Sequence, residues 1–194
     1  MSGHVSGELM TESTRRRLTD RQADTVRRLT DAAVEELRES GYDGLTVRNV
    51  AKHAGVAPAT AYTYFASKNH LITEVFWRRL SSLGPVPPSD EPKADRVVTV
   101  LREIALLVSD EPALAAACTT AMLGTDPDVQ ELRLRIGVAV HDRLRDALGT
   151  DASPQVLAAL ELVYAGALVQ AGMGYTPYAA IAGRLADVAR LIMR

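Results

Sequence analysis

The feature that most constrains this chain is a pair of short helical patterns that meet at Gly55. Apolar residues mark the first pattern at helical spacing: Val47, Val50, Ala51 and Ala54. Thr46 precedes them, where a hydroxyl can cap the first free backbone N–H groups. A glycine can adopt the left-handed conformation that ends one helix and lets the next leave steeply. Since Val56 and Ala61 then face the first helix, the sequence predicts a helix-turn-helix, whose second helix suits the DNA major groove.

The second pattern leaves small, polar and aromatic side chains facing outward: Ala59, Thr60, Tyr62 and Thr63. We expect these residues to lie near bases, together with Arg48, whose guanidinium can bind guanine with two hydrogen bonds. Thr46, Tyr64 and Lys68 are expected to contact phosphates. Replacing Lys68 should weaken binding to all sequences alike, whereas replacing Arg48 should relax base preference. Two short helices joined by glycine also occur in helical proteins that never touch DNA.

The same stretch resembles the DNA-binding signature of the TetR family of bacterial transcriptional regulators, over about residues 20 to 80. The matching pattern is Leu45-Thr46-Val47-Arg48, Ala51, Gly55-Val56 and Tyr62-x-Tyr64-Phe65-x-x-Lys68-x-x-Leu71. Ala57 departs from it, since family members often carry a capping serine there, and so does Thr63, where larger polar groups are common. The resemblance implies a homodimer that binds a palindromic operator on double-stranded DNA, most often as a repressor, and that responds to a small-molecule effector.

Helix signals run through the whole chain without any strand pattern, which predicts an all-α fold of about nine helices. A chain of 194 residues with 47% hydrophobic residues can bury a sizeable core. The net charge is +2 over residues 1–84 and −4 over the remainder, so the two parts are expected to have different partners. We expect a flexible basic arm (1–18), a helix-turn-helix DNA-binding domain (19–84, motif about 46–65), a linker (85–94) and a C-terminal helical bundle for effector binding and dimerisation (95–194).

Capping residues and prolines predict where the helices begin and end. Thr19 with Gln22 forms a capping-box pattern for a first helix that ends before Gly41. Two late helices are expected to begin at Ser153-Pro154 and Thr176-Pro177. In the arm, Arg15-Arg16-Arg17 is either a phosphate or minor-groove contact or a solvated run of charge.

The last two expected helices are apolar over more than one face, so each must bury a second face against something. A symmetric four-helix interface with a second copy is the simple explanation, and a monomeric core is the alternative. The residues predicted for this interface are Leu157, Leu160, Leu168, Leu185, Val188 and Ile192.

The middle helices, within residues 95–173, are expected to form the effector pocket that the family resemblance implies. Its candidate lining consists of apolar or bifunctional residues: Trp77, Leu106, Cys118, Met122, Ile136, His141, Tyr164 and Met173. Plain core packing is the alternative for each of them, and it is the commoner role of such residues. A mostly apolar pocket with few polar anchors would favour a hydrophobic effector.

Catalytic and metal-binding patterns are absent from the sequence. His4, His53, His70 and His141 show no paired metal spacing, and the chain has neither a phosphate-binding glycine loop nor a nucleophile elbow. The single cysteine, Cys118, excludes an internal disulfide and a cysteine-rich zinc site. We therefore expect no enzyme activity, no metal and no cofactor.

The beginning of the chain lacks the basic and apolar segments of a secretory signal. The longest apolar run, Val163 to Val169, is far shorter than the roughly 20 residues of a membrane span. A cytoplasmic protein without membrane contact is the expectation. The rival to a DNA-binding regulator is a helical carrier of lipids or small molecules, which would lack specific affinity for duplex DNA.

Overall fold

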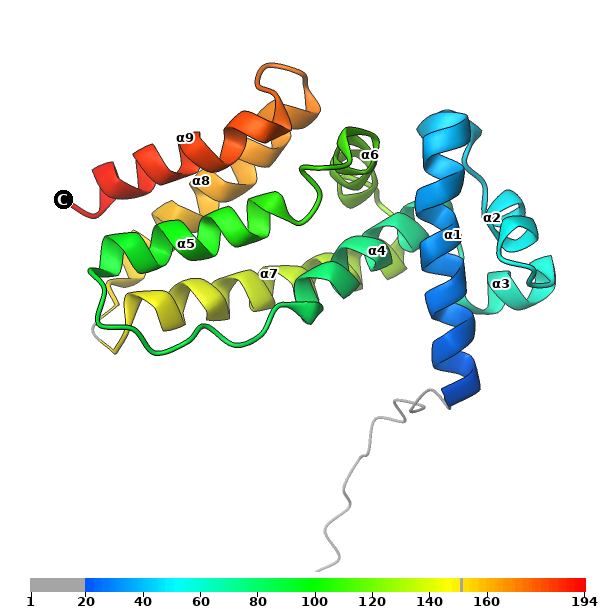
Figure 1. The fold of residues 1–194 in the computed structure, drawn as a ribbon, viewed down its shortest axis with the longest axis horizontal. Coiled ribbons are helices and arrows are strands. Elements are labelled where there is room, and N and C mark those ends of the chain that lie inside the picture. Colours follow the sequence, from blue (N-terminus) through cyan, green and yellow to red (C-terminus); the bar gives the residue numbers. More distant parts are fainter. Residues whose placement is uncertain (1–19, 151) are drawn as a thin grey trace, which may run out of the picture.

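A computed structural model describes residues 20–150 and 152–194, which form nine α-helices and no strand (Figure 1). The helices are α1 (Asp20–Gly44), α2 (Val47–His53), α3 (Pro58–Tyr64), α4 (Lys68–Ser82), α5 (Lys93–Leu106), α6 (Pro112–Met122), α7 (Pro127–Leu148), α8 (Pro154–Gly172) and α9 (Tyr178–Ile192). The predicted all-α fold is therefore confirmed. The predicted basic arm and the Thr19 cap lie outside the described residues.

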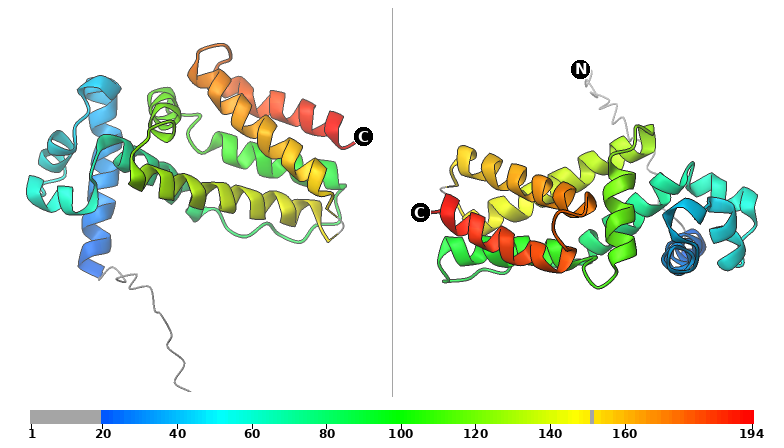
Figure 2. Two further views of the ribbon diagram at one scale, coloured as in Figure 1. Left: turned by 180° about the vertical axis from the view of Figure 1, so that it is seen from behind. Right: turned by 90° about the horizontal axis from the view of Figure 1, so that it is seen from above.

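The helices are arranged along the length of the molecule, with α1 to α3 at one end and α5, α8 and α9 toward the other (Figures 1 and 2). α4 joins the two parts, because it packs against α1 and also against α6 and α7. α5 packs against α7 and α9, and α8 packs against α9. Although residues 85–94 connect α4 to α5, α4 itself therefore belongs to both parts of the molecule.

Most of the predicted helix boundaries agree with the structure. Proline occupies the first turn of α6, α7 and α8, and the Ser153 hydroxyl accepts a hydrogen bond from the Val156 amide at 3.5 Å. α9 begins one residue later than expected, with Pro177 at the N-cap position, and the hydroxyl of the buried Thr176 accepts a hydrogen bond from Arg184 at 2.6 Å and caps no amide of the helix. The first helix is interrupted at Gly41 (φ 67°), as its glycine suggested, but helical structure continues for one short turn to Gly44.

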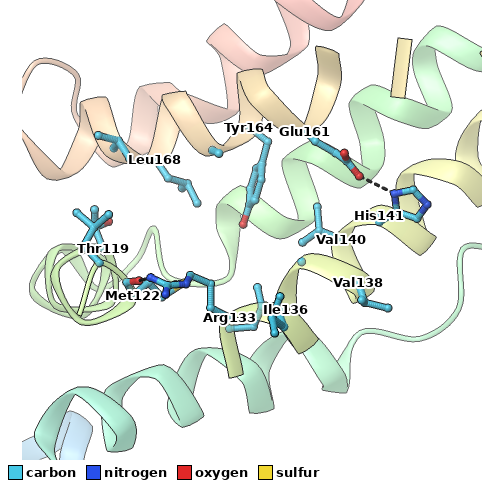
Figure 3. A pocket seen from close by; sticks show the side chains of 15 residues that line it. Thr119, Met122, Arg133, Ile136, Val138, Val140, His141, Glu161, Tyr164 and Leu168 are labelled. Atoms are coloured by element: carbon cyan, nitrogen blue, oxygen red, sulfur yellow. Dashed lines mark hydrogen bonds and ion pairs between the residues drawn. The ribbon is translucent and has the colours of Figure 1, made fainter. Parts of the chain in front are cut away.

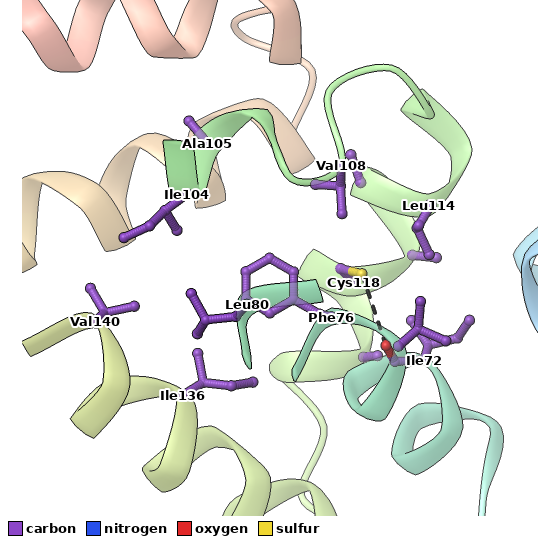
Figure 4. Packing of buried hydrophobic residues seen from close by; sticks show 14 of the residues in the cluster. Ile72, Phe76, Leu80, Ile104, Ala105, Val108, Leu114, Cys118, Ile136 and Val140 are labelled. Atoms are coloured by element: carbon purple, nitrogen blue, oxygen red, sulfur yellow. Dashed lines mark hydrogen bonds between the residues drawn. The ribbon is translucent and has the colours of Figure 1, made fainter. Parts of the chain in front are cut away.

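A continuous hydrophobic core runs from the end formed by α1 to α3 into the rest of the molecule (Figure 4). Phe76 and Ile72 of α4 lie at its middle, where α4 meets α6 and α7. Cys118 of α6 is buried in the same core, with its sulfur 4.0 Å from the Ile72 carbonyl oxygen. Burial raises the pKa of the Cys118 thiol to about 12, so it remains protonated and unreactive at neutral pH.

Candidate DNA-binding surface and effector cavity

The turn between α2 and α3 has the geometry that its glycine predicts. The Thr46 hydroxyl accepts a hydrogen bond from the Asn49 amide at 3.0 Å and caps α2, as expected. Gly55 has a φ of 63°, and the Val56 amide donates to the Ala51 carbonyl at 2.8 Å, which is the pattern of a helix that ends on a left-handed residue. Arg28 of α1 donates to the main-chain oxygens of Ala54 and Gly55, so the turn is held against α1.

The residues predicted to meet DNA lie at the outer end formed by α2 and α3 (Figure 1). Six of their side chains are exposed: Thr46, Arg48, Ala59, Thr60, Tyr62 and Thr63. Tyr64 is half-buried, and Ala61 is fully buried between the two helices, as its expected orientation requires. The Thr63 hydroxyl donates to the Ala59 carbonyl at 3.1 Å, which leaves its methyl group and oxygen lone pairs for outside contact. Ala57 provides no side-chain cap for α3.

Lys68, predicted to bind phosphate, already has a partner within the chain. Its ammonium donates to the Tyr42 carbonyl at 2.7 Å and lies 4.4 Å from the centre of the Tyr42 ring. The Tyr42 hydroxyl donates to the Asn69 side chain, which in turn donates to Asp126 at 3.1 Å. Because an ammonium has three N–H donors, Lys68 keeps two for a phosphate while it ties α4 to α1.

Glu111, just before α6, joins the DNA-binding end to the bundle. Its carboxylate accepts hydrogen bonds from Arg38 of α1, at 2.7 Å, and from Arg79 of α4. Burial alone would raise the pKa of Glu111, but the hydrogen bond and charge of Arg79, with help from Arg38, outweigh it and lower that pKa below its ordinary value of 4.5. The carboxylate therefore stays ionised and paired at neutral pH.

Substituting Glu111→Gln is expected to lower the free energy of unfolding by about 1.5–3 kcal/mol at pH 7, the range for hydrogen bonds to charged groups. Because the pKa of Glu111 is lowered in the folded protein, this contribution is present above pH 4.5 and is lost as the pH falls through the folded value. Urea unfolding of both proteins at several pH values measures it. Glu103→Gln is the matched control, since the Glu103 side chain is 42% exposed whereas that of Glu111 is 13% exposed; equal losses for both variants would contradict the assignment.

A group of side chains that could act as metal ligands lies between α1 and α2. Glu36, Glu39 and His53 bring one ligand atom each within 4.8 Å of one another, with the His53 Nδ1 3.7 Å from the Glu36 carboxylate. Glu39 and His53 are exposed to solvent. The arrangement is that of an ion pair that holds α2 against α1 whenever the imidazole is protonated.

A cavity of about 760 Å³ opens between α6, α7 and α8 (Figure 3). Its volume lies within the range of small-molecule sites, and most of its lining is aliphatic. The lining side chains with polar groups are Thr119, Arg133, His141, Glu161 and Tyr164. His141 Nδ1 lies 2.7 Å from the Glu161 carboxylate, and the hydroxyl of the buried Tyr164 points into the cavity. Burial raises the pKa of Tyr164, so its hydroxyl is a neutral hydrogen-bond donor.

Half of the predicted pocket residues line this cavity: Met122, Ile136, His141 and Tyr164. The structure corrects the other four. Trp77 packs beside Arg135, whose guanidinium carbon lies 4.7 Å from the ring centre, and Cys118 is buried against α4. Leu106 is 49% exposed at the end of α5, and Met173 is 63% exposed just after α8, so neither reaches the cavity.

The structure places the six residues predicted for the dimer interface in different environments. Leu157, Leu160 and Leu185 are buried within their own chain, and Leu168 lines the cavity. Val188 and Ile192 are half-buried on α9 and remain available for contact. The exposed apolar and small residues of α8 include Ala158, Leu162, Ala165 and Gly166, none of which is among those six.

α8 contains the longest apolar run that the sequence analysis considered. Within the described residues it is the one helix long and apolar enough to cross a membrane, with 19 residues and a mean hydropathy of 1.3, and 22% of that window is buried. Only its length and composition indicate a membrane span, and the core helix of a soluble protein can have the same length and composition. The run from Val163 to Val169 understated the helix, because single polar residues interrupt an otherwise apolar sequence.

Several residues at these sites carried no usable sequence signal. Arg133, Glu161 and Thr119 line the cavity, yet charged and hydroxyl side chains on helices usually mean a solvated face. Their role depends on how α6, α7 and α8 are arranged, which residue spacing does not specify. Glu111 was missed for the same reason, because its two arginine partners lie 73 and 32 residues away.

Comparisons with known proteins agree with this geometry. A family model described as bacterial regulatory proteins of the tetR family matches residues 29–75. An uncharacterized HTH-type transcriptional regulator of Mycobacterium tuberculosis is 49% identical over 175 residues, which cover 89% of this chain and 82% of the relative.

Two crystal structures share the fold over most of their length. A TetR transcriptional regulator from Rhodococcus sp. RHA1 has a TM-score of 0.72 at 24% identity, over 90% of this chain and 98% of that one. The transcriptional regulator FadR of Bacillus subtilis, in complex with stearoyl-CoA, has a TM-score of 0.60 at 16% identity, over 84% of this chain and 96% of that one.

Proposed function

Because the chain belongs to the TetR family of bacterial transcriptional regulators, we propose that it is a homodimeric repressor that binds a palindromic operator and is released by a hydrophobic effector. As a family member it is a regulator and not an enzyme. The observation that carries the proposal is the presence, in one chain, of an exposed α2–α3 unit and a largely apolar cavity. Binding to operator DNA would place the protein in the cytoplasm.

The surface of α8 and α9 supports the proposed dimer. Leu162 of α8 and Leu191 of α9 are 74% and 61% exposed, and the small residues around Leu162 allow another helix to approach closely. A second copy packed on this face would cover the apolar surface and form a four-helix interface. It would also present two recognition helices about 34–36 Å apart, one turn of DNA, which suits a palindrome.

The recognition surface divides into two groups of contacts. Arg48, Thr60 and Tyr62 are exposed and are proposed to read base edges, with the methyl groups of Ala59 and Thr63 available to thymine. Thr46, Tyr64 and Lys68 are proposed to contact phosphates and set the register on the duplex. A dimer clamped on a promoter in this way would exclude other proteins from it, and this is why we favour repression.

Replacing Arg48 with alanine is expected to cost about 1–3 kcal/mol of operator binding and to relax base preference, while binding to random duplex falls much less. Fluorescence anisotropy with operator and scrambled duplexes measures both affinities. Lys52→Ala is a suitable control, because Lys52 is an exposed cation at the other end of the same helix. An equal loss on both duplexes would show that Arg48 contacts only the phosphate backbone.

The effector is proposed to bind in the cavity between α6, α7 and α8. Its aliphatic lining suits an apolar group, and the FadR complex shows that a protein of this fold accommodates a molecule with a long acyl chain. Release requires that the effector bind better to a conformation whose recognition helices are wrongly spaced for DNA. The ratio of the effector's affinities for the two conformations limits how far it can shift the population away from the DNA-binding conformation.

Selection of bound duplexes from a random pool, at about 150 mM salt to suppress nonspecific phosphate binding, tests the proposal. Enrichment of a palindrome supports a dimeric reader of DNA and supplies a probe for effector screening. Absence of any enriched sequence, with or without candidate effectors, would contradict it and favour a carrier of small molecules. Transcription in vitro from a promoter that contains the palindrome then separates repression from activation.

A further inference from the structure

Arg133, which is exposed to solvent, brings a positive charge to one end of a largely aliphatic cavity. It projects from α7 toward the end of α6, near Met122 (Figure 3). Its Nη1 donates to the main-chain oxygens of Met122 at 2.7 Å and of Gly124 at 3.5 Å. Both acceptors are neutral, and among the described residues no carboxylate lies within ion-pair distance of this guanidinium. The charge at this end of the cavity is therefore not neutralised by the chain.

The free side of the Arg133 guanidinium has the geometry that recognises an oxyanion. Both of its hydrogen bonds come from Nη1, so the Nε and Nη2 side keeps its N–H donors and has no partner among the residues that the structure describes. This side of a guanidinium matches the two oxygens of a carboxylate or phosphate, with two parallel hydrogen bonds.

Tyr164 supplies a second, independent indication of a polar ligand group. The residue is only 8% exposed, but its hydroxyl faces the open cavity and makes no hydrogen bond with another described residue. Because this hydroxyl is open to the cavity, it is available to donate a hydrogen bond to an acceptor group of a ligand.

The acidic group of the cavity lies away from Arg133. Glu161 is paired with His141, and His141 follows Arg133 by eight residues on α7, which corresponds to a distance of about 12 Å along the helix. The Arg133 end thus attracts an anion, while the surface between the two ends is largely aliphatic.

We propose that the effector is an amphipathic anion, with an apolar chain in the aliphatic part of the cavity and an acidic head bound by Arg133, while Tyr164 donates a hydrogen bond near the head. This inference rests on the proposed function, since it names the chemical class of the same effector. Carboxylates and phosphates share the required chemistry, and the experiment below distinguishes them.

The position of Arg133 also connects the head to the DNA-binding end. The segment that it holds, Met122 to Gly124, leads directly to Asp126 at the start of α7. Asp126 accepts a hydrogen bond from Asn69 of α4, and Asn69 accepts one from Tyr42 of α1. A ligand whose acidic head repositions Arg133 therefore acts on a segment that is hydrogen-bonded to α4 and is linked to α1 through Asn69.

The test measures direct binding of four ligands with the same twelve-carbon chain: dodecanoate, dodecyl phosphate, dodecanoyl-CoA and uncharged dodecanol. Calorimetry on the full chain without DNA is expected to give affinities for at least one anion about tenfold to a hundredfold above that for dodecanol. The preferred anion identifies the head as carboxylate, phosphate or thioester-linked nucleotide. Equal affinity for dodecanol and all three anions would overturn the inference.

Variants locate the head. Arg133→Gln should lower affinity for the preferred anion about tenfold to a hundredfold and leave dodecanol binding unchanged, while Arg133→Lys recovers part of the loss. Tyr164→Phe should cost about two- to tenfold. Arg145→Gln is the matched control, because Arg145 lies on the same helix and pairs with Asp142 and Asp146. If Arg133→Gln weakens dodecanol and the anion equally, the head lies elsewhere.

Operator release is scored separately, so that this inference and the proposed function fail in different ways. An anion that binds through Arg133 but leaves operator affinity unchanged would keep the head assignment and overturn the effector role. Release of the operator by dodecanol as readily as by the anions would keep the regulator and overturn the head assignment.

Discussion

Replacing Phe76 with alanine is expected to lower the free energy of unfolding by about 3–5 kcal/mol, a large part of the stability of a typical domain. Phe76 is 2% exposed and lies in the core where α4 meets α6 and α7 (Figure 4). Truncation removes apolar contacts and leaves a cavity that neighbours from several helices cannot fill together. Because α4 also packs against α1, we expect the DNA-binding end and the bundle to lose stability together.

Urea unfolding at fixed protein concentration, followed by circular dichroism and by fluorescence of the single tryptophan, Trp77, measures this effect. Coincident transitions from both probes indicate one cooperative unit. Tyr175→Ala is the control, because a side chain that is 77% exposed should contribute less than about 0.5 kcal/mol. An early, separate loss of helical signal with no change at Trp77 would mean that α1 to α3 unfold independently.

The local signals in the sequence were sufficient for most of the fold. Gly55 ends α2 in a left-handed conformation, and Pro112, Pro127 and Pro154 stand in the first turns of three later helices. These features act through backbone conformation and missing N–H groups, which depend little on the rest of the molecule. Thr176 shows the limit, because it is buried and accepts a hydrogen bond from Arg184 instead of capping α9, which begins one residue later than expected.

The candidate DNA-binding surface and the cavity also differ in how far the sequence alone predicts them. The exposure of Arg48 and Tyr62 follows from helical spacing within one short motif, so the sequence was enough to predict it. The cavity depends on the packing of α6, α7 and α8, and an apolar residue such as Cys118 or Met122 cannot indicate by itself whether it faces core or cavity. For α8, periodicity found several apolar faces but did not show that Leu160 turns inward while Leu162 turns outward.

Substituting Leu162→Glu is expected to convert the proposed dimer to monomers and to weaken operator binding by at least about a hundredfold. Leu162 is 74% exposed in the single chain, so the glutamate costs little in the monomer. Across a dimer interface the same carboxylate would meet its own copy and apolar helices, where a charge without a partner is strongly unfavourable. Losing the dimer removes the gain of about 10²–10⁴ that linked half-sites provide.

Sedimentation velocity and anisotropy with the selected operator measure the two effects on the same samples. Leu134→Glu is the matched control, because Leu134 is 72% exposed and lies on α7, in the wall of the cavity, and not on α8 or α9. That variant should remain dimeric and keep its operator affinity while its binding of apolar ligands falls. If Leu162→Glu stays dimeric, the two copies meet through another surface. If it becomes monomeric and still binds the operator tightly, one recognition helix is sufficient, and the palindrome is not read by a pair.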